Sequence, residues 1–320
     1  MARSLTPFFL AGVGAGAAAA AYATARALRS QPVPDGAVVL VTGGSRGLGY
    51  AIASRFARSP VRLVLAARDR LELATAQEML LTEHPHLHPE DFYLVDADLS
   101  NPAECRRVIT EVLTHFGRID VLVNNAGIIE VGPAEAQPLD AFYRAMHVHF
   151  YGPLHLIWAA LPHLRKQEAM PGWTRRAAIV NIASIGGKVA VPHMLPYTAS
   201  KFALVGFSEG LHAELRGHNI HVTTVCPGLM RTGGEHHADY IGDVDAERRW
   251  FNFVARAPLL STSVRHAASR IYSAVSQGCA EITITPHAWL AARVTGLCPG
   301  TAQIFSGLAN EYVLPAAPQA

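Results

Sequence analysis

Cysteine is scarce in this chain, and its few copies follow no pattern typical of a disulfide or zinc framework. The four cysteines are Cys105, Cys226, Cys279 and Cys298, and none belongs to a Cys-x-x-Cys pair. We therefore expect reduced, buried thiols, as in a cytoplasmic protein. The 16 histidines also lack the spacing of known metal ligands, so the sequence predicts no metal site.

Charge is sparse as well, which excludes some classes of partner. Only 16% of the residues are charged, and 27 basic against 25 acidic residues give a formal net charge of +2. No block rich in Lys and Arg appears, so we expect no nucleic-acid partner. Half of the 320 residues are hydrophobic, which is enough for the core of one large α/β domain.

One stretch, residues 4–25, lacks charge altogether. As a helix its 22 residues would span roughly 33 Å, about the thickness of one bilayer core. Ala and Gly dominate it, so insertion is only marginally favourable. We expect a membrane anchor or surface association with the rest of the chain in the cytoplasm. A helix packed on the domain is the second alternative, and a signal peptide cleaved after Ala25 is the third.

From residue 38 onward, short apolar runs alternate with helical patterns. The runs are continuously apolar, which is typical of strands that are covered on both faces of a parallel sheet. The alternation indicates right-handed crossovers, with ligands bound beyond the carboxyl ends of the strands. The sequence thus predicts an α/β fold, a Rossmann-type doubly wound parallel sheet of about seven strands with helices on both faces. The expected strands are 38–41, 62–65, 92–95, 120–123, 178–182, 221–225 and 282–284, and the longer expected helices are 70–83, 102–116, 139–166 and 195–216.

Composition divides the chain into three parts. Residues 1–36 are an apolar segment and linker, residues 37–285 form the Rossmann-type domain, and residues 286–320 are an apolar C-terminal extension. For this extension we keep three alternatives: it shields a pocket, pairs with another subunit or touches a membrane.

A glycine-rich loop follows the first expected strand directly. Glycines there let the backbone turn tightly and approach a pyrophosphate, which then rests on the N-terminus of the next helix. The position between strand and helix favours a dinucleotide site over an ordinary turn. The loop residues that we assign to this cofactor are Thr42, Gly43, Ser45, Arg46, Gly47, Leu48 and Gly49.

The end of the second expected strand bears on which dinucleotide binds. An acidic residue there accepts a ribose 2′-hydroxyl, whereas arginine suits a 2′-phosphate. The acid position holds Ala67, Arg68 follows it, and Arg46 is placed to reach the same phosphate. Asp69 is the competing ribose acceptor, but its place three residues before Glu72 indicates a helix cap. We expect NADP(H), with NAD(H) as the alternative.

A serine, a tyrosine and a lysine in the second half suit hydride-transfer chemistry. Ser184 ends the fifth expected strand, and Tyr197 and Lys201 are four residues apart on one helix face. A carbonyl that receives hydride develops alkoxide character and must gain a proton. A tyrosine can donate that proton if a nearby cation lowers its pKa, and a serine hydroxyl can hydrogen-bond the oxyanion.

Five motifs, in this order, resemble the short-chain dehydrogenase/reductase family over about residues 37–285. They are Thr42-Gly43…Gly47-Leu48-Gly49, Asn124-Asn125-Ala126-Gly127, Ser184, Tyr197…Lys201 and Pro227-Gly228…Thr232. The resemblance implies an enzyme that transfers hydride between nicotinamide and a carbonyl or alcohol carbon. It implies that Tyr197 is the general acid/base and Ser184 the oxyanion partner, and that Lys201 binds the nicotinamide ribose and lowers the tyrosine pKa. Homodimers or homotetramers are also implied.

The same resemblance assigns the remaining cofactor contacts. Asp98, followed by Leu99, would meet the adenine, and Asn124 would lie at the ribose side with Ala126 and Gly127 in the same motif. The residues that would flank the nicotinamide are Pro227, Gly228 and Thr232.

One position departs from the family pattern. Family members usually have an asparagine in the long central helix, and its backbone carbonyl helps to hold a water in a proton relay to the lysine. Here that position holds His149, which still offers the carbonyl and adds an imidazole that could titrate near neutral pH. The alternatives are that His149 merely packs in the helix, or that the chain is a catalytically impaired nucleotide-binding regulator. The intact Ser184, Tyr197 and Lys201 favour the enzyme.

Residues 232–258 are expected to cover the substrate as a lid. Aromatic residues there favour an apolar substrate, although a helix that packs its own apolar face explains the same pattern. Further candidate pocket walls are Ile185, Met194, Leu195 and Met230. Ketone, aldehyde, steroid and acyl-chain substrates all stay open.

Overall fold

The computed structural model describes residues 30–234, 237–257 and 261–315. The uncharged segment 4–25, for which a membrane contact was expected, lies outside the described residues. Within the described ranges, no helix is long and apolar enough to cross a bilayer.

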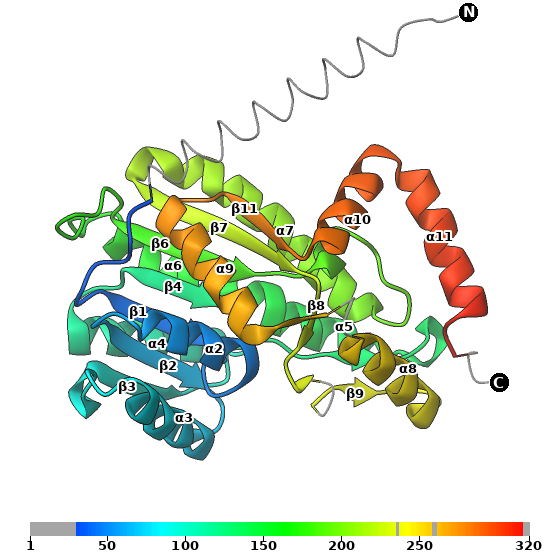
Figure 1. Cartoon of the computed structure of the whole chain (residues 1–320), viewed down its shortest axis with the longest axis horizontal. Coiled ribbons are helices and arrows are strands. Elements are labelled where there is room, and N and C mark those ends of the chain that lie inside the picture. Colours follow the sequence, from blue (N-terminus) through cyan, green and yellow to red (C-terminus); the bar gives the residue numbers. More distant parts are fainter. Residues whose placement is uncertain (1–29, 235–236, 258–260, 316–320) are drawn as a thin grey trace, which may run out of the picture.

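Seven parallel strands form the central sheet, which confirms the predicted Rossmann-type fold (Figure 1). Their order in the sheet is β11-β7-β6-β4-β1-β2-β3, so the chain reverses direction across the sheet between β1 and β4. That switch point is where such sheets bind ligands. The strands are β1 (Val38–Thr42), β2 (Arg62–Ala67), β3 (Phe92–Asp96), β4 (Val121–Asn124), β6 (Ala177–Ile182), β7 (Ile220–Pro227) and β11 (Glu281–Ile284).

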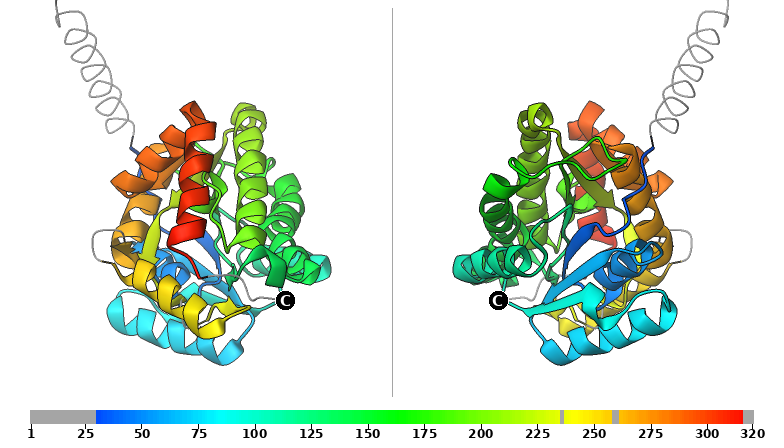
Figure 2. Two further views of the ribbon diagram at one scale, coloured as in Figure 1. Left: turned by 90° about the vertical axis from the view of Figure 1, so that its right-hand side faces the viewer. Right: turned by 90° about the vertical axis from the view of Figure 1, so that its left-hand side faces the viewer.

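Helices cover both faces of this sheet (Figure 2). One buried cluster joins α2, α3 and α9 to one face, and a second joins α4, α6 and α7 to the other. Adjacent residues of β1 serve opposite faces, since Val39 packs in the first cluster and Leu40 in the second. These helices are α2 (Gly47–Phe56), α3 (Arg70–Glu83), α4 (Pro102–Phe116), α6 (Gly152–Leu164), α7 (Leu195–Leu215) and α9 (Val264–Gln277).

The single helix expected over 139–166 is wrong in one respect. The structure has α5 (Leu139–Met146), a π-helical turn (His147–Tyr151) and then α6. Pro153 lacks an N–H group and cannot continue a regular helix from α5, whereas Gly152 bonds back to the carbonyl of His147. A Cβ on Gly152 would lie 2.8 Å from the carbonyl oxygen of Leu99, so glycine lets this turn approach the loop after β3.

Smaller elements surround the carboxyl edge of the sheet. β5 (Glu130–Val131) pairs with β9 (Asp239–Tyr240), and β8 (Leu229–Arg231) pairs with β10 (Ser261–Ser263). The expected lid contains β9 and α8 (Val244–Arg256), and the C-terminal extension forms α10 (Pro286–Leu297) and α11 (Pro299–Tyr312). Short 3₁₀ turns occur at Pro89–Asp91, Ala134–Ala136, Ile185–Gly187 and Arg216–His218.

Candidate active site

The glycine loop joins β1 to α2 at the switch point. Gly43 and Gly47 have φ angles of 63° and 56°, a region that favours glycine. A Cβ on Gly49 would lie 2.0 Å from the carbonyl oxygen of Gly43, so the first turn of α2 packs directly on the loop. This turn has no acidic side chain, and Arg46 at its N-cap makes no capping hydrogen bond. The first N–H groups of α2 therefore suit a pyrophosphate.

Thr42 fixes this loop from within. Its hydroxyl accepts from the N–H groups of Asn125 (2.9 Å) and Ala126 (3.1 Å) and donates to the carbonyl of Val123. The amide of Asn125 donates in return to the carbonyl of Thr42 at 2.9 Å. The ends of β1 and β4 are thus held together, and the buried Thr42 shapes the site without lining it.

A cavity of about 670 Å³ opens beyond the carboxyl ends of β1 to β4. Among the residues predicted to contact the cofactor, Thr42 holds the loop, Leu48 packs in the core, and Asn124 donates to Asn181 at 2.8 Å, so these three do not line the cavity. The other predicted residues outside its lining are Gly47, Gly49, Lys201, Pro227, Gly228 and Thr232. The predicted residues that do line it are Gly43, Ser45, Arg46, Arg68, Asp98, Leu99, Ala126 and Gly127, and the sequence missed Ala97, Ser100, Asn125, Ile128 and Val148.

The wall of the cavity formed by β2 and α3 is rich in charge. Asp69 accepts from the N–H groups of Leu71 (2.8 Å) and Glu72 (3.1 Å), so its predicted role as a helix cap is confirmed. Arg68 is exposed on the same wall. Arg46 donates to the Glu72 carboxylate at 2.7 Å and therefore already has an acidic partner.

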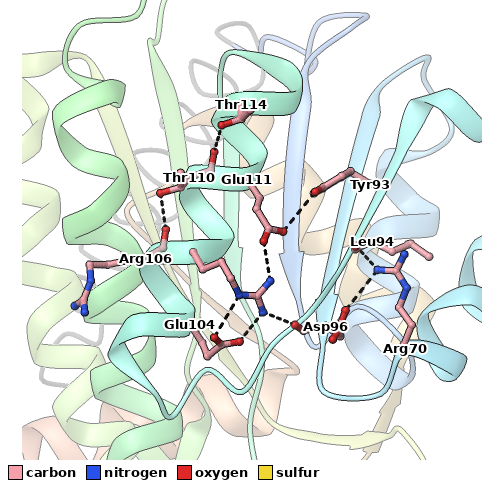
Figure 3. Close-up of polar contacts among 10 residues, drawn as sticks. Arg70, Tyr93, Leu94, Asp96, Glu104, Arg106, Thr110, Glu111 and Thr114 are labelled. Atoms are coloured by element: carbon pink, nitrogen blue, oxygen red, sulfur yellow. Dashed lines mark hydrogen bonds and ion pairs between the residues drawn. The ribbon is translucent and has the colours of Figure 1, made fainter.

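Side chains of α3 and α4 brace the end of β3 (Figure 3), and Arg70 of α3 also lines the cavity. Arg107 donates to the carbonyl of Asp96 at 2.6 Å and pairs with Glu111 at 2.8 Å. Arg70 donates to the carbonyl of Leu94 at 2.6 Å. These bonds fix the backbone that leads to Asp98, whose carboxylate accepts from the backbone and hydroxyl of Ser100. Asp98 therefore lies on a rigid edge of the cavity.

Ser184, Tyr197 and Lys201 meet at the carboxyl end of β6. The Ser184 hydroxyl accepts from the N–H of Gly186 at 3.0 Å and is hydrogen-bonded to Tyr197. The Lys201 ammonium donates to the carbonyl of Ile182 at 2.8 Å and lies 5.6 Å from the centre of the Tyr197 ring. The structure thus brings together all three residues of the predicted set.

Burial dominates the proton affinities of this set. It raises the pKa of Tyr197, against a smaller lowering by the hydrogen bond with Ser184, and it lowers the pKa of Lys201 to about 7. The expected lowering of the tyrosine pKa by Lys201 is not what the structure shows, because the ammonium is directed to Ile182 and both groups lie out of water. The phenol of Tyr197 therefore holds its proton at neutral pH.

His149 lies in the π-helical turn with both ring nitrogens hydrogen-bonded. Nε2 accepts from the N–H of Ile128 at 3.0 Å, so a neutral ring carries its hydrogen on Nδ1, 2.8 Å from Oγ of Ser200. The Ser200 hydroxyl donates to the carbonyl of Tyr197 at 2.8 Å. Burial and the charge of Lys201 lower the pKa of His149 well below its ordinary value. The imidazole does not titrate near neutral pH, and it does more than pack.

An apolar cluster packs against Tyr197. Its buried members are Val131, Met194 and Phe251, with Trp250 packed beside them. Met194, a predicted pocket wall, belongs to this cluster, whereas Met230, also predicted as a wall, packs against the core cluster of α2, α3 and α9.

A buried polar pair, which the sequence did not reveal, supports this cluster. Nδ1 of His193 lies 2.8 Å from the Glu247 carboxylate, whose other oxygen accepts from the indole of Trp250 at 2.5 Å. His193 has a φ of 61°, in the left-handed region, and its carbonyl accepts from the N–H of Gly132. The pair fastens α8 to the segment that leads into α7 and Tyr197.

The residues predicted to flank the nicotinamide lie in two different parts of the structure. Gly228 follows Pro227 at the end of β7, and a Cβ there would lie 2.5 Å from the hydroxyl of Thr285, so this glycine allows close packing on β11 and α10. Thr232 accepts from the N–H of Gly234, and its carbonyl lies 3.6 Å from the Cβ position of Gly47. The Thr232 loop is thus a neighbour of the glycine loop.

Comparison with known proteins agrees with this geometry. The family model described as short chain dehydrogenase matches residues 37–239. The chain is 37% identical over 198 residues to a dehydrogenase/reductase SDR family protein 7-like of Anopheles gambiae, covering 62% of this chain and 60% of the relative. It is 34% identical over 198 residues to 11-beta-hydroxysteroid dehydrogenase 1A of Arabidopsis thaliana, covering 62% of this chain and 53% of the relative.

A solved structure shows the same fold. A short chain dehydrogenase/reductase from Burkholderia phymatum, crystallised with NAD, superposes with a TM-score of 0.73 at 23% identity, covering 89% of this chain and 98% of the other. The matched part of this chain spans about 60% or less of the mosquito and plant relatives. With the family match over residues 37–239, these findings show that the chain belongs to the short-chain dehydrogenase/reductase family of oxidoreductases.

Proposed function

We propose that the chain is an NADP(H)-dependent oxidoreductase that interconverts the carbonyl and alcohol forms of an apolar small molecule. The observation that carries this proposal is the meeting of Ser184, Tyr197 and Lys201 beside a cavity with a dinucleotide-type glycine loop. Arg46 and Arg68 on the cavity wall support a 2′-phosphate. They favour NADP(H), with NAD(H) as the alternative that the bound cofactor of the Burkholderia structure keeps in view.

The residues present fit such a cofactor. Gly43 and Gly49 let the loop pack closely on α2 and on the end of β4, and the N-terminus of α2 offers N–H groups to a pyrophosphate. Asp98 lies on the cavity edge where an adenine would bind, and Lys201 would hold the nicotinamide ribose. When bound, the nicotinamide supplies or accepts the hydride.

The chain's own residues manage the proton. Tyr197 keeps its phenolic proton at neutral pH because burial raises its pKa, so it can donate to a substrate oxygen that gains negative charge. Ser184 lies next to that phenol and supplies the hydroxyl that hydrogen-bonds the same oxygen. His149 acts as a positioning residue, because its neutral ring fixes Ile128 on one side and, through Ser200, the backbone of Tyr197 on the other.

The substrate side favours an apolar molecule. Val131, Met194 and Phe251 are buried together beside Tyr197, so the surroundings of its ring are apolar. The name of the plant relative makes hydroxysteroids one class to test, beside ketones and aldehydes of rising chain length. Homodimers or homotetramers, and contact of residues 4–25 with a membrane, stay predictions.

NADPH oxidation against this panel, with wild type and Tyr197→Phe, tests the proposal. We expect turnover by the wild type and loss of turnover in Tyr197→Phe, with nearly the same NADPH affinity by fluorescence titration. Tyr143→Phe is the matched control, because Tyr143 is 62% exposed on α5. Most of the turnover surviving in Tyr197→Phe would refute the acid role. NADPH binding without turnover on any substrate would favour the catalytically impaired regulator.

A further inference from the structure

A carboxylate of the chain itself occupies donors in the dinucleotide cavity. The hydroxyl of Ser45 donates to one oxygen of Glu72 at 3.0 Å, and the guanidinium of Arg46 donates to the other at 2.7 Å. All three residues line the cavity. Their side chains lie at its open rim, with 47% of Arg46 and 40% of Glu72 exposed, so a ligand can reach them.

The donors that Glu72 uses are those that a 2′-phosphate needs. A hydroxyl and a guanidinium bind carboxylate and phosphate oxygens in the same way, and Arg46 is one of the two arginines that support NADP(H). Glu72 occupies the Ser45 hydroxyl and one N–H group of Arg46, and its charge repels a phosphate that binds at the remaining donors of the same guanidinium. Binding of NADP(H) is therefore weakened unless the carboxylate moves aside.

Local structure favours the carboxylate where it is. Glu72 lies in the first turn of α3, where the helix dipole stabilises a negative charge. The adjacent Arg70 is already bonded to the carbonyl of Leu94 and lies 3.6 Å from Asp96, so it offers no simple alternative partner. Because displacing Glu72 requires free energy, it weakens the binding of NADP(H).

For a dinucleotide without the 2′-phosphate, such as NAD(H), the carboxylate of Glu72 is a favourable partner. A free ribose 2′-hydroxyl is a donor, and a carboxylate on this wall of a dinucleotide site can accept from it. Asp69 does not serve this purpose, since its carboxylate caps α3. Glu72 is the carboxylate that also contacts the glycine loop.

We propose that Glu72 sets the ratio of the affinities of this chain for NADP(H) and NAD(H). Its carboxylate competes with the 2′-phosphate of NADP(H) for Ser45 and Arg46, and it accepts a hydrogen bond from the 2′-hydroxyl of NAD(H). The proposal rests on the proposed function, because it deepens the choice between the two dinucleotides. It assigns a specificity-determining role to a residue that neither the glycine motif nor the expected acid position includes.

Calorimetric titration with 2′,5′-ADP and 5′-AMP tests the proposal without any turnover. These two probes differ only in the 2′-phosphate. In Glu72→Gln, which keeps the size and removes the charge, we expect 2′,5′-ADP to bind about tenfold more tightly, equivalent to about 1.4 kcal/mol. Binding of 5′-AMP should change less than about twofold, because an amide oxygen still accepts from a hydroxyl.

Two further variants sharpen the test. Glu78→Gln removes an exposed carboxylate from the same helix, away from the cavity lining, and should leave both affinities unchanged. Arg46→Gln should weaken 2′,5′-ADP and reduce the effect of a second Glu72→Gln change, because the donor for which both anions compete is gone. Circular dichroism of each variant confirms that it folds.

The outcomes separate the two proposals. If wild type binds both probes and Glu72→Gln leaves their affinity ratio unchanged, the role of Glu72 is wrong while the oxidoreductase proposal stands. If wild type binds neither probe nor either dinucleotide, the proposed function falls and this inference with it. If Glu72→Gln raises the affinity for 5′-AMP relative to that for 2′,5′-ADP, the inference is also overturned.

Discussion

The cofactor side of this molecule and the proposed substrate side are built on different principles. The cofactor side depends on main-chain geometry, with Gly43 and Gly47 at positive φ and Gly49 packed on a carbonyl oxygen. The substrate side depends on side chains, namely an apolar cluster held by the buried His193 and Glu247. Every dinucleotide presents the same pyrophosphate, so a fixed backbone serves it, whereas a substrate wall must match one molecule.

The largest expected effect breaks the cofactor side. Gly49→Ala places a methyl group 2.0 Å from the carbonyl oxygen of Gly43, so the loop must shift away from α2. We expect a loss of about 3 kcal/mol in the free energy of unfolding and a large loss of NADPH affinity. Urea denaturation and fluorescence titration measure the two effects.

Gly210→Ala is the matched control for this change. A Cβ on Gly210 of α7 meets no atom within 4 Å. Because alanine is the better helix former, we expect a gain of about 0.5–1 kcal/mol with unchanged cofactor binding. If Gly49→Ala and Gly210→Ala change stability and NADPH affinity equally, the close contact of Gly49 with the carbonyl of Gly43 does not determine the shape of the loop.

A smaller effect is expected from breaking the substrate side. Glu247→Ala leaves the buried His193 and the half-buried indole of Trp250 without their partner, at a cost of about 2 kcal/mol in unfolding free energy. The KM for an apolar ketone should rise while NADPH affinity stays the same, since α8 does not line the cofactor cavity. Glu135→Ala, at an exposed carboxylate, is the control. An unchanged KM together with weaker NADPH binding would contradict this division of the molecule.

The smallest effect concerns pH. Burial raises the pKa of Tyr197, so the proton that reduction needs is present through neutral pH and is lost only as pH rises through that pKa. We expect kcat/KM for ketone reduction to fall as the pH rises through the pKa of Tyr197, while alcohol oxidation, which needs the phenolate, rises over the same range. Deprotonation of Lys201, whose pKa is about 7, should add a separate step near neutral pH to both profiles.

His149→Asn should leave these two profiles in place, because the pKa of the imidazole lies well below neutral pH already. An ionisation near neutral pH that is present in wild type and absent in the variant would show that the ring transfers protons. The profiles therefore distinguish a positioning residue from a proton relay.

The sheet and the glycine loop could be predicted because their signals are local. Continuous apolar runs such as Val38–Thr42 indicate doubly covered strands, and Gly43 to Gly49 directly follow the first of them. The signals for α9 are its capping residues and not its apolar pattern, since Ser263 caps its start and Gly278 ends it with a φ of 64°.

The errors in the site have a different cause. Asn124 and Asn125 are neighbours, and strand alternation directs one to Asn181 in the interior and the other to the loop of Thr42. Only the register of β4 decides which is which. His193 and Glu247 are 54 residues apart, and no local pattern connects them.

The central place of β1 in the sheet has a consequence for folding during translation. This strand is synthesised before both of its partners, β2 and β4, and the N–H of Val38 bonds to the carboxylate of Asp120, 82 residues later. At ordinary translation speeds that interval lasts roughly ten seconds. During it, the apolar stretch Val38–Thr42 has an unsatisfied edge that can pair with other chains. Nascent chains that stop before Asp120 should therefore depend on chaperones. Chains that extend past Asn125 can pair β1 with β4 and form the hydrogen bond from the N–H of Asn125 to the hydroxyl of Thr42.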